Sequence, residues 1–345
     1  MRSLSLFRWF LHLSILGITI ATPSHDYREQ FTQVWTAPMP APEQTRKAHT
    51  EPGVFAPPPD DFIHQEWQIA NNYMYGSPDI SFIPDPYDHH NGSSVMRVLY
   101  GAGSYSPKGS TGDHRSGGAE FYSTPFGNQS YARALLEYDM AMDAGFDWIS
   151  GGKLPGIYGG KPSEGCSGGR QADGQNCFSI RLMWRENGFG EAYLYIPTNE
   201  VLCRDTPEVM CNKHYGVSLF RGRIQFPKEQ WTRVQIAVQL NDPPSQSNGV
   251  LQVWQDNQLV MDIDGLQFRT TNAVAISSLM FSTFFGGSTP EYATPHDTYT
   301  YFKNIQFSVA DPVELSAPVA SMALLSFSVP RLLLYSCIVV SVLWT

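Results

Sequence analysis

The sequence predicts an all-β fold, a two-sheet antiparallel sandwich of the β-jelly-roll type. Short stretches of alternating apolar and polar residues recur along the chain, and turn-forming residues separate them. Aromatic residues make up 13% of the 345 residues and charged residues only 16%, while there are 29 glycines and 25 prolines. Because no long stretch combines a helical period with end caps, these patterns favour a sandwich or jelly roll.

The predicted strands follow one another along most of the chain. They lie at 94–104, 119–126, 131–143, 177–184, 191–197, 217–226, 231–240, 249–268, 276–287 and 299–309. The stretch 249–268 is expected to be a hairpin that turns at Asp256 and Asn257. No internal repeat and no second domain boundary interrupts the series, so we expect one domain over residues 61–312.

The N-terminal region has two expected parts. Residues 1–21 resemble a secretory signal peptide, with Arg2 and Arg8 beside an apolar run that ends in the small-residue site Thr19 to Ala21. Residues 22–60 are rich in proline and polar residues, which predicts a linker or an extended arm.

The C-terminal region, residues 313–345, is a hydrophobic tail whose one basic residue after position 317 is Arg331. Small residues at 316–318, a spacer and a final apolar run resemble a GPI-attachment signal. A retained transmembrane span is the alternative, and the sequence leaves both open. We therefore expect the only membrane contact to be through this tail or its lipid anchor.

The cysteines and sequons fit a secretory route. Two local disulfides are the economical pairing, Cys166 with Cys177 and Cys203 with Cys211, although other pairings among the four remain open. The fifth cysteine lies in the tail. Asn91 and Asn128 each begin a glycosylation sequon. The expected location is outside the cell, either secreted or on the outer face of the plasma membrane or cell wall.

The net charge of −9 argues against nucleic acid as a partner. An anionic polysaccharide is not excluded, because an acidic protein can carry a local basic cleft. No CxxC pair or HxxxH spacing predicts a metal site, and the expected chemistry needs no cofactor. We expect the protein to act as a monomer.

The stretch "GGKLPGIYGG", residues 151–160, contains five glycines and a single cation, Lys153. Glycines this dense disfavour helix and strand, so we expect a glycine-rich loop that bends closely around the lysine. A solvated loop charge and a cation held in an active site are both compatible with this pattern.

The next two predicted strands carry a paired polar face. Successive side chains of a strand point to opposite faces, so Ser179 and Arg181 share one face of "CFSIRLMW", and Tyr193 and Tyr195 share one face of "EAYLYIP". The short connection 185–190 predicts a hairpin, which places both polar faces on the same side of one sheet. An ordinary solvent-facing strand pair would show the same residue types.

At this point the chain resembles polysaccharide lyase family 14, which includes alginate and glucuronan lyases. The resemblance is carried by "GGKLPGIYGG", "GCSGG" and "CFSIRLMWRENGFGEAYLYIP", and it continues through several later segments over residues 90 to 310. It implies a β-jelly roll, and the fit to fungal members is closest. The family's functional lysine, Ser-x-Arg and Tyr-x-Tyr match Lys153, Ser179, Arg181, Tyr193 and Tyr195.

These residue types suit β-elimination at a uronate. Arg181 and Lys153 can neutralise the sugar carboxylate, which lets negative charge develop as the C5 proton leaves. Tyr193 or Tyr195 can act as base or as acid, and Lys153 is a further candidate for the base. Ser179 is expected to orient the substrate. The sequence does not separate these assignments.

Other residues give weaker signals. His214 and Arg221 are candidates for binding neighbouring sugars. Glu137, Asp139 and Asp143 share one strand face, as in jelly-roll glycoside hydrolases, but we interpret them as structural or surface residues. The primary hypothesis is a secreted or surface-anchored lyase of 1,4-linked polyuronate, with glucuronan slightly favoured over alginate. The alternative is a non-catalytic carbohydrate-binding jelly roll at the cell surface.

Overall fold

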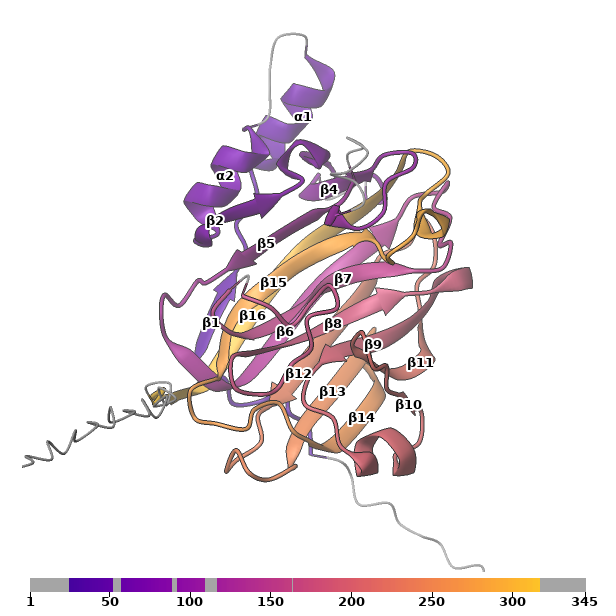
Figure 1. The fold of residues 1–345 in the computed structure, drawn as a ribbon. Helices are drawn as coiled ribbons and strands as arrows, with labels where there is room; N and C mark the ends of the chain where they lie inside the picture. The colour runs from indigo at the N-terminus through magenta and orange to yellow at the C-terminus, as the bar shows by residue number, and fades with distance from the viewer. Residues whose placement is uncertain (1–24, 52–56, 89–91, 109–116, 163, 317–345) are drawn as a thin grey trace, which may run out of the picture.

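The computed structural model describes residues 25–51, 57–88, 92–108, 117–162 and 164–316. In this part of the chain the strands form an antiparallel network that folds into two layers (Figure 1). The layers are joined where β15 pairs with β6 at a single register position, Ile276 with Tyr131. This is the predicted β-jelly roll.

The first layer carries the stretches that matter for function. Its strand order is β10–β11–β9–β8–β7–β15–β5–β2. The bounds are β2 Ile69–Tyr75, β5 Ala119–Ser123, β7 Gly152–Gly160, β8 Cys177–Trp184, β9 Phe189–Tyr195, β10 Val209–Met210, β11 Val217–Gln225 and β15 Ile276–Phe285.

The second layer closes the sandwich. Its strands are β1 Gln33–Thr36, β3 Ile80–Pro84, β4 Ser94–Tyr100, β6 Ser130–Met142, β12 Thr232–Gln239, β13 Gly249–Gln255, β14 Gln258–Leu266 and β16 Thr298–Val313. β6 lies between β16 and β12, and β16 pairs on its other side with β1 and β4. β13 and β14 form the predicted hairpin, which turns at Asp256 and Asn257 with φ values of 49° and 66°.

The main core lies between the two layers. Phe281 of β15 and Phe302 of β16 meet edge to face across it, with ring centroids 5.1 Å apart. Trp184 of β8 packs against Tyr100 of β4 and Phe285 of β15. Alternation explains this core, because every second side chain of each strand turns inward and excludes water.

The N-terminal arm is packed onto the sandwich rather than standing apart from it. Two helices, α1 Pro42–Thr50 and α2 Pro59–Glu66, cover one edge of the molecule above β2 and β5 (Figure 1). β1 adds to β16, and Trp35 of β1 contacts the fully buried Trp67 with centroids 5.8 Å apart. Both helices begin with proline at the first helical position, where a missing N–H costs nothing.

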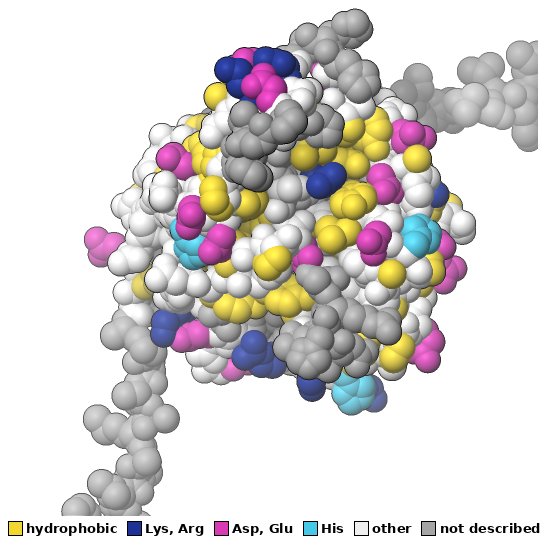
Figure 2. Space-filling view, turned by 90° about the horizontal axis from the view of Figure 1, so that it is seen from above, with side chains coloured by type: hydrophobic (Ala, Val, Ile, Leu, Met, Phe, Trp, Pro, Cys, Tyr) yellow, Lys and Arg dark blue, Asp and Glu magenta, His cyan; other side chains and the backbone are white. Residues whose placement is uncertain are grey.

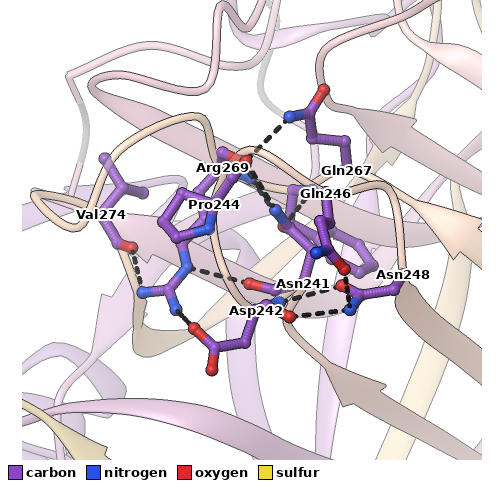
Figure 3. Close-up of polar contacts among 9 residues, drawn as sticks. Asn241, Asp242, Pro244, Gln246, Asn248, Gln267, Arg269 and Val274 are labelled. Carbon is purple, nitrogen blue, oxygen red and sulfur yellow. Dashed lines mark hydrogen bonds and ion pairs between the residues drawn. The ribbon is translucent and has the colours of Figure 1, made fainter.

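Two loops at one end of the sandwich are tied together by a buried amide. The Asn241 side chain accepts the N–H groups of Phe268 and Arg269 and donates to the carbonyls of Pro244 and Arg269 (Figure 3). The buried Arg269 donates to the carbonyls of Asn241 and Val274. Residues 268–274 are therefore held firmly against the loop after β12.

Charges of both signs are interspersed on the face seen from above, where a basic side chain also lies among hydrophobic ones (Figure 2).

Both disulfides have the local pairing expected, Cys166–Cys177 and Cys203–Cys211. Asn128 is exposed in the turn before β6. Asn91, the segment expected to be a signal peptide and most of the hydrophobic tail lie outside the described residues. Within the described part of the chain, no helix is long and apolar enough to cross a membrane.

Candidate active site

β8 and β9 place the predicted polar residues on one face. Phe178, Ile180, Leu182 and Trp184 of β8 turn into the main core, so Ser179, Arg181 and Met183 lie on the opposite face. The register pairs Arg181 with Tyr193 and Ser179 with Tyr195. Residues directly opposite in an antiparallel pair point the same way, so these four side chains share a face, as alternation predicts.

The glycine-rich stretch is a strand, β7, and the expectation of a loop is wrong. It pairs with β8 on one side and with β15 on the other. Its glycines serve close approach: a Cβ on Gly156 would lie 1.9 Å from the Ile180 carbonyl oxygen, and one on Gly159 would lie 2.2 Å from the Phe178 ring. Glycine within a strand commonly marks such contacts, which sequence composition does not distinguish from a loop.

A β-bulge in β7 brings Lys153 to the site. Lys153 pairs with Met183 and Gly156 with Arg181, so three steps along β7 match two along β8. The extra residue is absorbed at Leu154 and Pro155, and Leu154 fills the core. Lys153 therefore faces the same side as Arg181 despite its odd spacing from Gly156.

Arg181 is a buried guanidinium with unused donors. It is 1% exposed, and its Nη1 donates to the Ser282 hydroxyl at 3.2 Å. Ser282 in turn donates to Glu120 at 2.8 Å, and Glu120 also accepts from the Tyr73 hydroxyl. Among the described residues, neither Nε nor Nη2 of Arg181 has a hydrogen-bond partner. A buried charge left in this way is costly unless a ligand completes it.

Lys153 lies beside this guanidinium. Its Nζ is 3.8 Å from the centroid of the Tyr193 ring and 2.7 Å from Sδ of Met183. Burial lowers the pKa of Lys153 well below its usual value, and the positive charges of Arg181 and Arg185 lower it further. Glu191 opposes this effect. The lowered pKa favours a neutral amine that can accept a proton.

Both active-site tyrosines are buried. Their rings meet nearly at right angles, with centroids 5.9 Å apart. Burial, together with Tyr195, raises the pKa of Tyr193 above its usual value, so Tyr193 stays protonated and can donate. The Tyr193 hydroxyl accepts the N–H of Gly216 and the Tyr195 hydroxyl accepts the N–H of Gly169, each at 3.0 Å.

The remaining predicted residues lie around this group. The hydroxyl of Ser179 is fully buried and donates to the Cys166 carbonyl at 2.6 Å. His214 is exposed in the loop before β11. Arg221 reaches the site through Glu191, to which its Nε donates at 2.6 Å. The structure thus brings Lys153, Arg181 and the tyrosines together, with Ser179 beneath a neighbouring loop and His214 at the surface.

Glu191 is the charged residue that the sequence analysis missed. It is fully buried and is bound by Arg185, Arg221 and Ser218. Burial opposes its ionisation, but the hydrogen bonds and charges of these partners lower its pKa. Alternation could have found it, because Glu191 stands two residues before Tyr193 on the same face.

The three carboxylates Glu137, Asp139 and Asp143 lie on β6 or directly after it, in the other layer. Glu137 is bound by Arg233 and Gln235, and Asp139 by Asn304. Asp143 accepts from Thr298. These contacts agree with the structural interpretation of the three carboxylates.

A jelly roll that sets a guanidinium and a lysine amine beside two phenols on one sheet face has the groups needed for elimination at an acidic sugar. This combination indicates the class of polysaccharide lyases. The family model for polysaccharide lyase 14 matches residues 88–305, and the chain belongs to this family.

Solved structures support the assignment. A marine family-14 alginate lyase from Aplysia kurodai is 33% identical, with a TM-score of 0.62, and the match covers 82% of this chain and 100% of that one. An alginate lyase from Chlorella virus is 21% identical, with a TM-score of 0.57 over 71% of this chain and 93% of that one, and shares the fold.

The fit to fungal members stays a prediction. An endo-β-1,4-glucuronan lyase from the fungus Trichoderma reesei is 9% identical with a TM-score of 0.46, and the match covers 69% of this chain and 90% of that one. No curated protein matches the chain.

Proposed function

We propose that this lyase cleaves a 1,4-linked polyuronate by β-elimination, with alginate and glucuronan as the two substrate candidates. The observation that carries the proposal is the buried Arg181, whose Nε and Nη2 have no partner among the described residues. These two donors form one edge of the guanidinium, which suits a carboxylate bound by two parallel hydrogen bonds.

The proposed reaction assigns one task to each group. Arg181 neutralises the uronate carboxylate at the site of cleavage. The neutral amine of Lys153 takes the C5 proton, the C4–O4 bond breaks, and a C4=C5 double bond forms. Tyr193 or Tyr195 gives its hydroxyl proton to the departing O4. The products are a new hydroxyl end and a 4-deoxy sugar with an unsaturated ring.

Alginate comes first among the substrates we propose, although the sequence analysis placed glucuronan slightly ahead. The Aplysia structure at 33% identity is named an alginate lyase. Structures of the alginate lyase Aly36B were obtained as mutants in complex with an alginate trisaccharide and tetrasaccharide. Glucuronan offers the same carboxylate and the same 1,4-linkage, so it remains the second candidate.

We also propose that the protein is exported and acts as a monomer outside the cell. The apolar first twenty-one residues, the apolar tail and the exposed sequon at Asn128 support this location. Mass spectrometry of the mature protein would test it: the expected result is a chain beginning near residue 22 that carries glycan at Asn128. A mature protein that retains the first 21 residues would contradict export.

The substrate proposal is tested with the purified full-length protein on alginate, glucuronan and an uncharged 1,4-glucan. We expect absorbance from the conjugated double bond with a polyuronate only, and mass spectrometry should find end units that lack one water. Hydrated ends would indicate hydrolysis instead. Binding to polyuronate without any product would support the non-catalytic alternative.

Substitutions at Lys153 separate its two possible tasks. Lys153→Arg places a permanent cation at this position and removes the base, so we expect a loss of kcat of about a hundredfold or more, close to that of Lys153→Ala. If Lys153 only clamps the carboxylate, Lys153→Arg will retain most of the activity. Lys161→Ala is the control, because this exposed residue forms an ion pair with Glu164 and with no other described residue.

The pH dependence follows from the same assignment. A base must be neutral, so kcat should rise with pH through the pKa of Lys153, which lies well below its usual value. The rising limb should disappear from the residual activity of Lys153→Arg.

A further inference from the structure

The hydroxyl oxygens of both active-site tyrosines are held by the main chain. Tyr195 accepts the N–H of Gly169, and Tyr193 accepts the N–H of Gly216, each at 3.0 Å. A hydroxyl that accepts such a bond has its lone pair engaged, so its own proton points elsewhere. The same N–H stabilises the phenolate that remains when the proton has left.

Disulfides close or adjoin both loops that supply these amides. Gly169 lies within the Cys166–Cys177 loop, and Gly216 follows shortly after the Cys203–Cys211 loop. The two segments are also joined to each other, because the side-chain amide of Gln171 donates to the Tyr215 carbonyl at 2.9 Å. They meet at the end of the site where the tyrosines lie.

The Cys166–Cys177 loop is anchored at both ends. At its start, the Cys166 carbonyl accepts from Ser179 and the neighbouring Gly165 carbonyl accepts from Tyr158. At its far side, the Gly174 carbonyl accepts the N–H of Thr270 at 2.9 Å. Thr270 directly follows Arg269, which belongs to the buried network around Asn241 (Figure 3). The position of the Gly169 amide is thus fixed from the core of the sandwich.

We propose that the Cys166–Cys177 loop is a positioning element of the lyase reaction, which acts by holding the Tyr195 hydroxyl through the Gly169 amide. The proposal rests on the function proposed above. In the elimination step, the Tyr195 O–H bond breaks and its proton goes to O4 of the leaving sugar. The Gly169 N–H remains in place and stabilises the negative charge that is left on the phenolate oxygen.

Two neighbouring glycines provide a matched test of this role. Gly168 and Gly169 both have positive φ, 58° and 86°, so alanine strains the backbone at either position. At Gly168 the added Cβ meets no described atom within 4 Å, and at Gly169 it makes an ordinary contact, 3.4 Å from the His214 carbonyl oxygen. The difference is that the strain at Gly169 falls on the residue whose own N–H binds the Tyr195 hydroxyl. We expect Gly169→Ala to lower kcat about tenfold with little change in KM, and Gly168→Ala to leave both near wild type.

A double-mutant cycle provides a readout that a merely structural defect would not move. In a Tyr195→Phe background, Gly169→Ala should have no further effect on residual kcat, because the hydroxyl through which it acts is gone.

Removal of the disulfide extends the test to the whole loop. The double variant Cys166→Ser, Cys177→Ser should lose kcat at least as strongly as Gly169→Ala, measured well below its unfolding midpoint. Circular dichroism at the assay temperature verifies that the double variant is folded. If it is unfolded, the comparison of Gly169→Ala with Gly168→Ala decides whether the loop positions Tyr195.

The outcomes separate this inference from the proposed function. An active wild type in which Gly169→Ala and Gly168→Ala behave alike would overturn the role of the loop and leave the lyase assignment intact. A wild type that forms no unsaturated product from any polyuronate would overturn both. A kcat loss that persists unchanged in the Tyr195→Phe background would also overturn the inference.

Discussion

At the scale of single residues, the site is a balance of buried charges. Besides burial, the charges of Arg181 and Arg185 lower the pKa of Lys153, and the charge of Glu191 opposes them. Burial makes each of these interactions stronger than it would be in water. The proton affinity of Lys153 therefore depends in part on Arg185 and Glu191, to which the proposed reaction assigns no contact with the substrate.

We predict that Glu191→Gln shifts the rising limb of the kcat–pH profile to lower pH. Glu191 raises the pKa of Lys153, so loss of its charge should lower that pKa further. The substitution also removes the counter-charge of Arg185, which should cost about 3 kcal/mol of unfolding free energy. Kinetics across pH and urea titration measure the two effects.

Glu208→Gln is the matched control for this prediction. Glu208 forms an exposed pair with Arg223 on the nearby β10–β11 edge, and solvent screens such pairs. Glu208→Gln should therefore leave the kcat–pH profile unchanged. A Glu191→Gln profile that coincides with wild type would show that Glu191 does not tune Lys153.

The sequence could place Arg181 and the tyrosines but not their partners. Period-two alternation fixes the face of Ser179, Arg181, Tyr193 and Tyr195 without any long-range information. The Ser282 hydroxyl that holds Arg181 is about a hundred residues away along the chain. Such a contact depends on the order of strands in the layer, which no local pattern contains.

At the scale of secondary-structure elements, β7 needs glycine because the neighbouring strand lies too close for a side chain, and not because the strand must be flexible. We predict that Gly156→Ala destabilises the protein by about 3 kcal/mol or more, since the new Cβ would lie 1.9 Å from the Ile180 carbonyl oxygen. Activity should fall as well, because β7 and β8 carry Lys153 and Arg181. Urea titration and the absorbance assay measure these effects.

Gly145→Ala is the control for the strand. Gly145 lies in an exposed turn, and the nearest atom to its added Cβ is 3.7 Å away on the His296 side chain. It should have little effect on either measurement. Equal effects of the two substitutions would contradict the close pairing of β7 with β8.

Elements were predicted well where alternation is regular and poorly where it is broken. The regular strands β8, β9 and β12 were expected within a few residues of their observed bounds. In β7, strict alternation from Gly156 would have turned Lys153 into the core. The bulge at Leu154 and Pro155 reverses this, and a bulge depends on tertiary pairing that the local sequence does not specify.

At the scale of the whole molecule, the N-terminal arm is part of the packed structure. We predict that Trp35→Ala costs about 2 kcal/mol of unfolding free energy, because Trp35 packs against the buried Trp67. Val34→Ala is the matched control: Val34 is the next residue of β1 and is 55% exposed, so its loss should cost less than about 0.5 kcal/mol. Urea titration of both variants decides whether the arm is docked in solution.

The sequence predicted the jelly roll but left open whether residues 22–60 are a linker or an extended arm. Its prolines and polar residues do resemble a linker, and a four-residue strand such as β1 gives too little pattern to detect. What holds the arm is pairing with β16, at the other end of the described chain. Contacts between distant ends of a chain are the part of a fold that composition and periodicity inform least.

The order of strands in the first layer has a consequence for how the site can be inherited. β7, β8, β9 and β11 are neighbours in space and come from one continuous part of the sequence, which also contains the two disulfide segments and β10. Residues 152–221 thus contain Lys153, Arg181, the two tyrosines and the loops that hold them in one continuous stretch of sequence. Recombination between relatives that exchanges this segment would transfer nearly all of the proposed catalytic groups in one step. The recipient would still have to supply Ser282, whose hydroxyl accepts a hydrogen bond from Arg181.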